Sequence, residues 1–195
     1  MAIILSGSSN YKPVPAGIHP ARCIGAVTLG LQATNWGDKR QLYLKFEIPG
    51  ELGDDGEPMT IGRTYTASLT PKAALRKDLD AWLGRPLTKE ELRRFDITQM
   101  AGKPCLLNVS HYEKADGGTG ANIAGILPLM KDQSAPPQRF PSLIFGDDST
   151  DAEWEKLPEW LRKKIMRPSD RPADDLPAEE PAFNDDIPFG EDVPQ

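Results

Sequence analysis

The stretch RQLYLKFEI at residues 40–48 carries the clearest secondary-structure signal in the chain. Its apolar row consists of Leu42, Leu44, Phe46 and Ile48, and its polar row of Gln41, Tyr43, Lys45 and Glu47. A period of two places one row on a buried face and the other on an outer face, as in a half-buried β-strand. We therefore expect a mainly β protein in which the polar row of this strand faces solvent.

Strands are also expected on both sides of this segment. Residues 18–34 are rich in small and β-branched side chains. Gly25 and Gly30 interrupt them, as glycines do at a bulge or a sharp bend of a curled strand. After an acidic, glycine-rich hairpin loop at 49–58, residues 59–69 have the composition of a third strand.

A helical insert is expected after the third strand. Thr70 fits an N-cap, Pro71 fits the first turn, and Gly84 fits the end of one amphipathic helix. Thr88 and Glu91 have the spacing of a capping box, which predicts the start of a second, short helix.

Two further strands are expected at residues 103–112 and 119–129, joined by a hairpin turn. Three strands, a helical insert and two strands is the order of the oligonucleotide/oligosaccharide-binding (OB) fold, a five-stranded, partly open barrel. We expect residues 18–131 to form such a barrel, with its helical insert between strands three and four. Residues 1–17 are expected to form an extended arm.

The composition changes after residue 131. Residues 132–167 combine a proline-rich linker with a short amphipathic helix that Pro158 interrupts. This helix either packs back on the barrel or binds a partner. We favour packing, because exposed tryptophans are a liability.

Residues 168–195 form an acidic tail with nine Asp+Glu, a single Arg171 and six prolines. Such a composition cannot bury enough apolar surface to offset the entropy of ordering, so we expect a disordered tail. Residues 1–131 hold 16 Lys+Arg and 13 Asp+Glu, a net of +3, whereas residues 132–195 hold 7 and 16, a net of −9. A basic body joined to an acidic tail is typical of a protein that handles a polyanion.

The sequence offers no catalytic constellation. It lacks phosphate-binding loops, a nucleophile elbow and any Cys/His cluster of metal-ligand spacing, so we expect no enzyme activity, no metal and no cofactor. Cys23 and Cys105 are expected to be buried thiols rather than a disulfide. Without a signal peptide or a long apolar stretch, a cytoplasmic protein with no membrane contact is expected.

Aromatic and cationic side chains are available for binding single-stranded nucleic acid, which needs aromatic faces for bases and cations along the backbone. The candidates are Trp36, Lys39, Arg40, Tyr43, Lys45, Arg63, Tyr65, Tyr112 and Lys114. They fall on strands two and three and on two flanking loops, where OB folds bind ligands. Arg63 and Tyr65 share a face with Ile61, so that face is either core or binding surface.

The pentapeptide Asp185-Asp186-Ile187-Pro188-Phe189 resembles the C-terminal tip of bacterial-type single-stranded DNA-binding proteins. The body is similar to the OB-fold single-stranded DNA-binding proteins of tailed bacteriophages, through residues 69–86, 102–111 and 157–161. The resemblance implies that the pentapeptide binds replication or recombination proteins. In that family the tip ends at the phenylalanine, whereas six residues follow Phe189 here.

The function expected from these observations is coating of single-stranded DNA in phage or bacterial replication or recombination, with partners recruited by the tail. The alternative is an OB-fold adaptor between replication proteins with little affinity for DNA, since the body carries a net charge of only +3. The sequence leaves self-association into a homo-oligomer open.

Overall fold

The computed structural model describes residues 12–35, 37–134 and 137–165. The strands are β1 Gly17–Gln32, β2 Lys39–Leu52, β3 Pro58–Thr66, β4 Pro104–Glu113, β5 Thr119–Leu127 and β6 Leu143–Phe145. The helices are α1 Ala74–Leu83, α2 Lys89–Arg93, the 3-10 helix η1 Ile97–Met100, α3 Asp151–Glu155 and α4 Glu159–Ile165. The protein is mainly β, as the alternation in residues 40–48 predicts.

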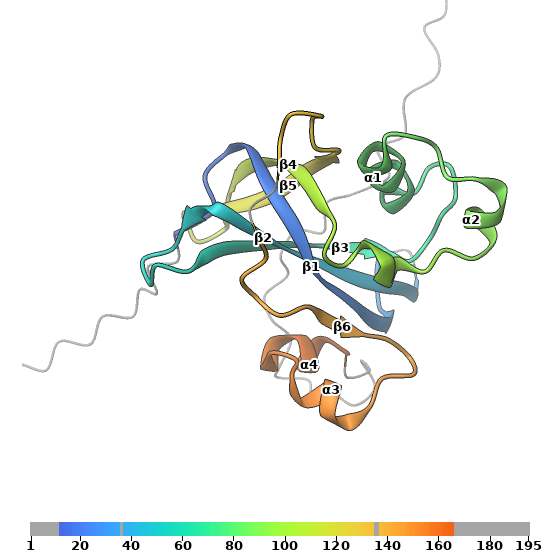
Figure 1. The fold of residues 1–195 in the computed structure, drawn as a ribbon. Coiled ribbons are helices and arrows are strands. Elements are labelled where there is room, and N and C mark those ends of the chain that lie inside the picture. Colours follow the sequence, from blue (N-terminus) through green and yellow to red (C-terminus); the bar gives the residue numbers. More distant parts are fainter. Residues whose placement is uncertain (1–11, 36, 135–136, 166–195) are drawn as a thin grey trace, which may run out of the picture.

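The strands form one six-stranded sheet with the order β3-β2-β1-β4-β5, and β6 lies beside β1 (Figure 1). Adjacent strands along this path are antiparallel, whereas β6 runs parallel to β1. In the described parts of the chain, no ladder of hydrogen bonds joins β3 to β5, so the sheet is not closed. No helix in these parts is long and apolar enough to cross a membrane.

The long strand β1 bends at two glycines, as its sequence predicts. Its register against β2 shifts between Cys23 and Gly25 and again between Thr28 and Gly30. Gly30 has a φ of 70°, a left-handed conformation that glycine adopts without steric cost. These bulges allow one strand to pair with β4 through its first half and with β2 through its second half.

The helical insert begins later than expected. Residues 70–73 form a turn, and Ala73 rather than Thr70 is the N-cap of α1. Gly84 ends the helix in the left-handed conformation, with a φ of 66°. The capping box of α2 forms as predicted, because the Thr88 hydroxyl accepts from the Glu91 N–H and the Glu91 carboxylate accepts from the Thr88 N–H.

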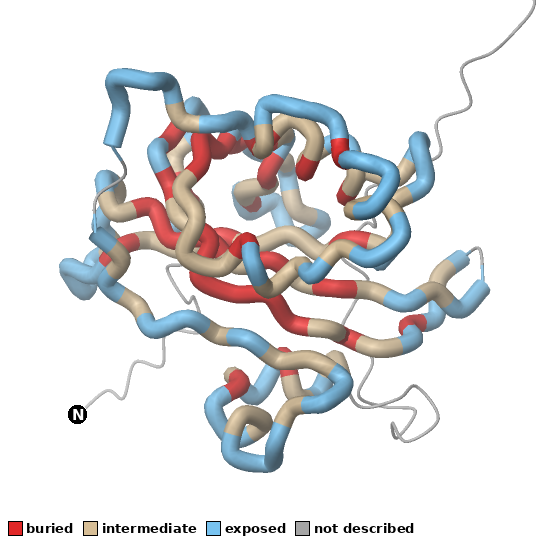
Figure 2. The backbone as a smooth tube through the Cα atoms, turned by 45° about the vertical axis from the view of Figure 1, so that its right-hand side comes forward, coloured by how far each residue is buried: buried red, intermediate tan, exposed pale blue. Residues whose placement is uncertain are grey.

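The main core lies between the inner face of the sheet and α1. Buried backbone is concentrated in the strands, and most loops are exposed (Figure 2). From α1, Leu75, Leu79 and Trp82 pack into this core. The indole N–H of Trp82 donates to the Pro104 carbonyl at 2.8 Å, so the polar atom of this large side chain is satisfied.

A second apolar cluster lies on the other side of the sheet. Residues 137–165 are called here the C-terminal segment. Its elements β6, α3 and α4 lie on that side of the sheet, away from α1 and α2 (Figure 1). Leu157 and Leu161 of this segment are buried with Val27 and Leu29 of β1. The amphipathic helix expected within residues 132–167 is thus two helices, one on either side of Pro158. They pack on the sheet, which is the alternative that the sequence favours.

Candidate nucleic-acid interface

Tyr43 is the central aromatic residue on the outside of β2. It pairs with Thr64 of β3, and a Cβ built on Gly62 would overlap its ring and hydroxyl. The ring therefore lies across β3 and stays partly exposed. The outer β2–β3 face is defined here as Gln41, Tyr43, Lys45, Thr60, Gly62 and Thr64, all of which are half-buried.

Lys45 lies next to Tyr43 in the same row, close to β1 and β6. A Cβ on Gly25 would lie 3.0 Å from the Lys45 Cβ and 3.3 Å from the Leu143 carbonyl oxygen. Burial lowers the pKa of Lys45, because the charged amine loses hydration. In the described parts of the chain, no carboxylate lies within ion-pair distance of this amine.

Glu47, the last polar residue of the same row, corrects the expectation that the whole row faces solvent. Its side chain is fully buried beneath the C-terminal segment. The two carboxylate oxygens accept hydrogen bonds from the backbone N–H groups of Arg139 and Phe140, at 2.8 and 2.9 Å. These charge-assisted bonds fix the start of the C-terminal segment against β2.

The start of β2 carries Lys39 and Arg40 beside the loop 33–38. Lys39 is half-buried, and Arg40 pairs with Asp147 of the C-terminal segment at 2.9 Å. Both side chains of that pair are 61% exposed, so the pair contributes little and a phosphate can replace Asp147. Trp36 lies outside the described residues.

Arg63 and Tyr65 belong to the inside of the fold, which corrects their assignment to a binding surface. Tyr65 is only 3% exposed and donates its hydroxyl hydrogen to Asp78 of α1 at 2.7 Å. Arg63 donates to the same carboxylate at 2.9 Å and to the Ile123 carbonyl of β5 at 3.2 Å. The two residues thus connect β3 to α1 and β5, and the Tyr65 ring is not accessible to a base.

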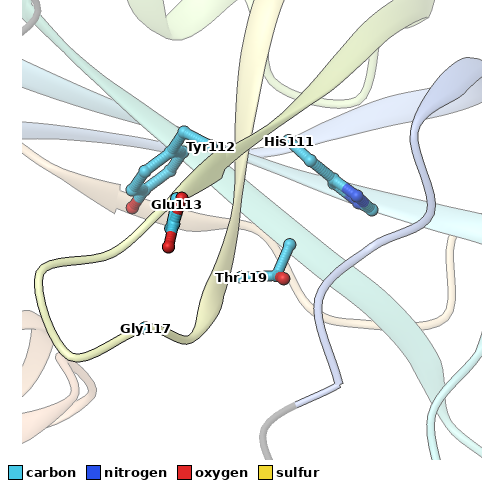
Figure 3. Close-up of a pocket in the computed structure, with 5 residues that line it drawn as sticks. All are labelled: His111, Tyr112, Glu113, Gly117 and Thr119. Carbon is cyan, nitrogen blue, oxygen red and sulfur yellow. The ribbon is translucent and has the colours of Figure 1, made fainter.

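Tyr112 and Lys114 lie at the hairpin between β4 and β5. The Tyr112 ring lies over Gly120 of β5, where a Cβ would overlap it. An open hollow of about 430 Å³ is lined there by His111, Tyr112, Glu113, Gly117 and Thr119 (Figure 3). Figure 3 shows Tyr112 and His111 pointing to opposite sides of β4, and His111 contacts the Val14 carbonyl at 2.8 Å. Lys114 is half-buried in the turn.

Trp160 of α4 also reaches this region, although the sequence does not single it out. Its ring contacts the Tyr43 ring in a T-shaped arrangement, with centroids 5.2 Å apart and planes at 87°. Helical spacing does not give this exposure in advance, because neighbouring residues such as Trp82 and Leu83 of α1 can share one apolar stripe. Leu161 is fully buried, whereas Trp160 is 48% exposed.

The described residues include eight of the nine candidates, which fall into groups. Tyr43 and Lys45 share the outer β2–β3 face, Lys39 and Arg40 lie at the start of the same strand, and Tyr112 and Lys114 lie at the β4–β5 hairpin. The pentapeptide 185–189 lies outside the described residues. No protein-family model and no curated protein matches this chain.

Proposed function

We propose that this chain is an OB-fold protein that binds single-stranded DNA. The strand order supports this reading, because β1 pairs with both β2 and β4 and the helical insert lies between β3 and β4. The missing β3–β5 ladder agrees with a partly open barrel, in which Arg63 bridges the gap to β5. OB folds bind oligonucleotides on the face of strands two and three, which corresponds to the outer β2–β3 face.

The observation that carries the proposal is that Tyr43 and Lys45 lie two residues apart in the same row of that face. A partly exposed ring offers a surface for stacking, and bases of any identity have a π-face. The adjacent half-buried amine can bind a backbone phosphate, which relieves the electrostatic cost of its burial. Together they match the two requirements of sequence-independent single-strand binding.

The biological role that we propose is coating of single-stranded DNA in phage or bacterial replication or recombination. This part rests on the resemblance of the tail pentapeptide and the body to single-stranded DNA-binding proteins. In this role Asp185 and Asp186 contact basic patches on partner proteins, and Phe189 fills an apolar pocket. Because Phe189 is followed by six residues, its carboxyl is an amide here and adds no charge to that contact.

A protein–protein adaptor is the second candidate, favoured by two observations. The C-terminal segment covers part of the outside of β1 and β2, and its Asp147 pairs with Arg40. Both features reduce the surface and the charge available to DNA. In that case the OB barrel would connect replication proteins without binding DNA strongly.

Titration of fluorescently labelled oligo-dT with the full chain separates the two candidates. DNA binding predicts saturable binding at about 50 mM salt, and an affinity that falls with salt with a slope near −0.7 per neutralised phosphate. If the protein is an adaptor, no saturable binding is expected even at about 50 mM salt. That second result would overturn the proposed function.

A further inference from the structure

Trp160 is an exposed aromatic residue on a helix that is otherwise fixed to the sheet. Its side chain is 48% exposed, whereas Leu157 and Leu161 on either side of it are buried against Val27 and Leu29. A single exposed apolar side chain is common on protein surfaces and does not by itself indicate a function. Trp160 is not isolated, because its ring contacts the partly exposed ring of Tyr43.

The position of α4 is set by hydrogen bonds as well as by packing. The side-chain amide of Gln32, at the end of β1, donates to the Lys164 carbonyl at 2.8 Å and to the Leu29 carbonyl at 2.6 Å. Gln32 is itself buried. The helix therefore lies next to the start of the loop 33–38, and Trp160 is presented at a fixed place rather than on a mobile chain.

The last turn of α4 is basic. Arg162, Lys163 and Lys164 lie two to four residues after Trp160, and Lys163 pairs with Glu159 at 3.1 Å. That pair is 63% and 75% exposed, so a phosphate can compete with Glu159 for the lysine. An exposed indole followed by cations is the same combination that Tyr43 and Lys45 provide on β2.

We propose that Trp160 stacks on a DNA base and that α4 forms the second half of the single-strand surface, beside the outer β2–β3 face. This inference rests on the proposed function and extends it to the C-terminal segment. A base stacked on the indole lies next to the Tyr43 ring. The DNA strand then passes between Lys45 on one side and the last turn of α4 on the other. The C-terminal segment is thereby part of the DNA site and does not obstruct it.

The test compares Trp160→Ala, Trp160→Leu and Trp160→Phe by oligo-dT titration of the full chain at about 50 mM salt. We expect the dissociation constant to rise about 10-fold for the alanine and leucine variants, which lack a π-face, and to stay within about 3-fold of wild type for the phenylalanine variant. The leucine variant keeps an apolar contact with Tyr43. It therefore keeps the test decisive if the alanine variant fails to fold. Melting temperatures measured alongside check this point.

Trp154→Phe is the matched control. Trp154 belongs to α3 and packs on Phe145 of β6, with ring centroids 5.7 Å apart, so its replacement should leave the affinity unchanged. If wild type binds DNA and Trp160→Leu binds equally well, the assignment of Trp160 is overturned while the proposed function stands. Tighter binding by Trp160→Leu would also overturn it, because the segment would then obstruct the site. Failure of wild type to bind overturns the proposed function itself.

Discussion

The ring of Tyr43 on β2 lies over the backbone of Gly62 on β3, in the space that a Cβ would occupy at any other residue. Tyr112 on β4 has the same relationship to Gly120 on β5. In both pairs the glycine lets a long aromatic side chain lie across the neighbouring strand instead of standing away from the sheet. Both tyrosines stay partly exposed, and Tyr43 also packs against the apolar cluster that the C-terminal segment forms with β1.

Gly62→Ala should displace the Tyr43 ring. Overpacking of this kind destabilises a protein by about 1–3 kcal/mol, and the displaced ring should also weaken oligo-dT binding. Gly125→Ala on β5 is the matched control, since a Cβ there meets nothing within 4 Å. Urea denaturation and DNA titration measure the two effects. Equal stability and affinity for Gly62→Ala and wild type would contradict this account of Tyr43.

Lys45→Gln should weaken DNA binding and make it less dependent on salt. Loss of one phosphate contact should make the slope of log affinity against log salt shallower by about 0.7. Because folding lowers the pKa of Lys45, the charged amine is unfavourable in the free protein, and stability should rise with pH towards the unfolded value of 10.5. The variant should therefore be at least as stable as wild type at pH 7. Lys89→Gln on α2, whose side chain is exposed, should leave the slope unchanged.

Arg63→Ala should affect folding more than DNA binding. It removes hydrogen bonds from a charged group to Asp78 and to the Ile123 carbonyl, which corresponds to about 2–3 kcal/mol of stability. Tyr65→Phe removes one hydrogen bond to the same carboxylate and should cost about 1–2 kcal/mol. DNA titration well below the melting temperature should give affinities close to wild type. A large loss of DNA affinity in the folded Arg63 variant would instead show that Arg63 contributes to the binding surface.

Cys23 and Cys105 should resist alkylation in the native protein. Both are free and buried, as the sequence predicts, and burial raises the pKa of Cys23 to about 12 from an ordinary 9.0. At pH 8 roughly one Cys23 thiol in ten thousand is then ionised. The unfolded chain ionises Cys23 near pH 9, whereas the folded protein does so only near pH 12. This contribution to the free energy of unfolding is therefore complete below pH 9 and is lost as the pH rises from 9 through 12. Iodoacetamide labelling with and without urea tests this, and rapid labelling of the native protein at pH 8 would contradict it.

Deletion of residues 168–195 should tighten DNA binding at low salt. The deleted segment carries nine Asp+Glu and one arginine, and such a segment competes with DNA for cationic surface. The gain should disappear at high salt, because screening weakens the competition. Titrations of the two chains at two salt concentrations decide this. Equal or weaker binding by the shorter chain would remove the idea of competition.

The strands and the helical insert could be predicted from the sequence because their signals are local. Alternation in residues 40–48, glycines at positions 25 and 30, and the capping box at Thr88 each depend on near neighbours. The same alternation predicts an outer face for Tyr43 and Lys45, and both lie on that face in the structure.

The remaining features depend on contacts between residues distant in sequence. Whether Arg63 and Tyr65 face the core is decided by Asp78, which is 13 residues or more along the chain on a different element. The burial of Glu47 is decided by backbone N–H groups at 139 and 140, more than 90 residues away. The strand β6 is three residues long, too short for any periodicity to reveal it.

The parallel pairing of β6 with residues 25–27 of β1 has a consequence for the stability of any shortened chain. Residues 17–22 of β1 pair with β4, and β6 takes the place of β4 along residues 25–27. A chain ending at residue 131 would leave this part of β1 as an open edge, with Val27 and Leu29 uncovered beside it. Unpaired N–H and C=O groups next to apolar side chains form a template for association between copies. We therefore expect a chain that ends at residue 131 to aggregate more readily than the full chain.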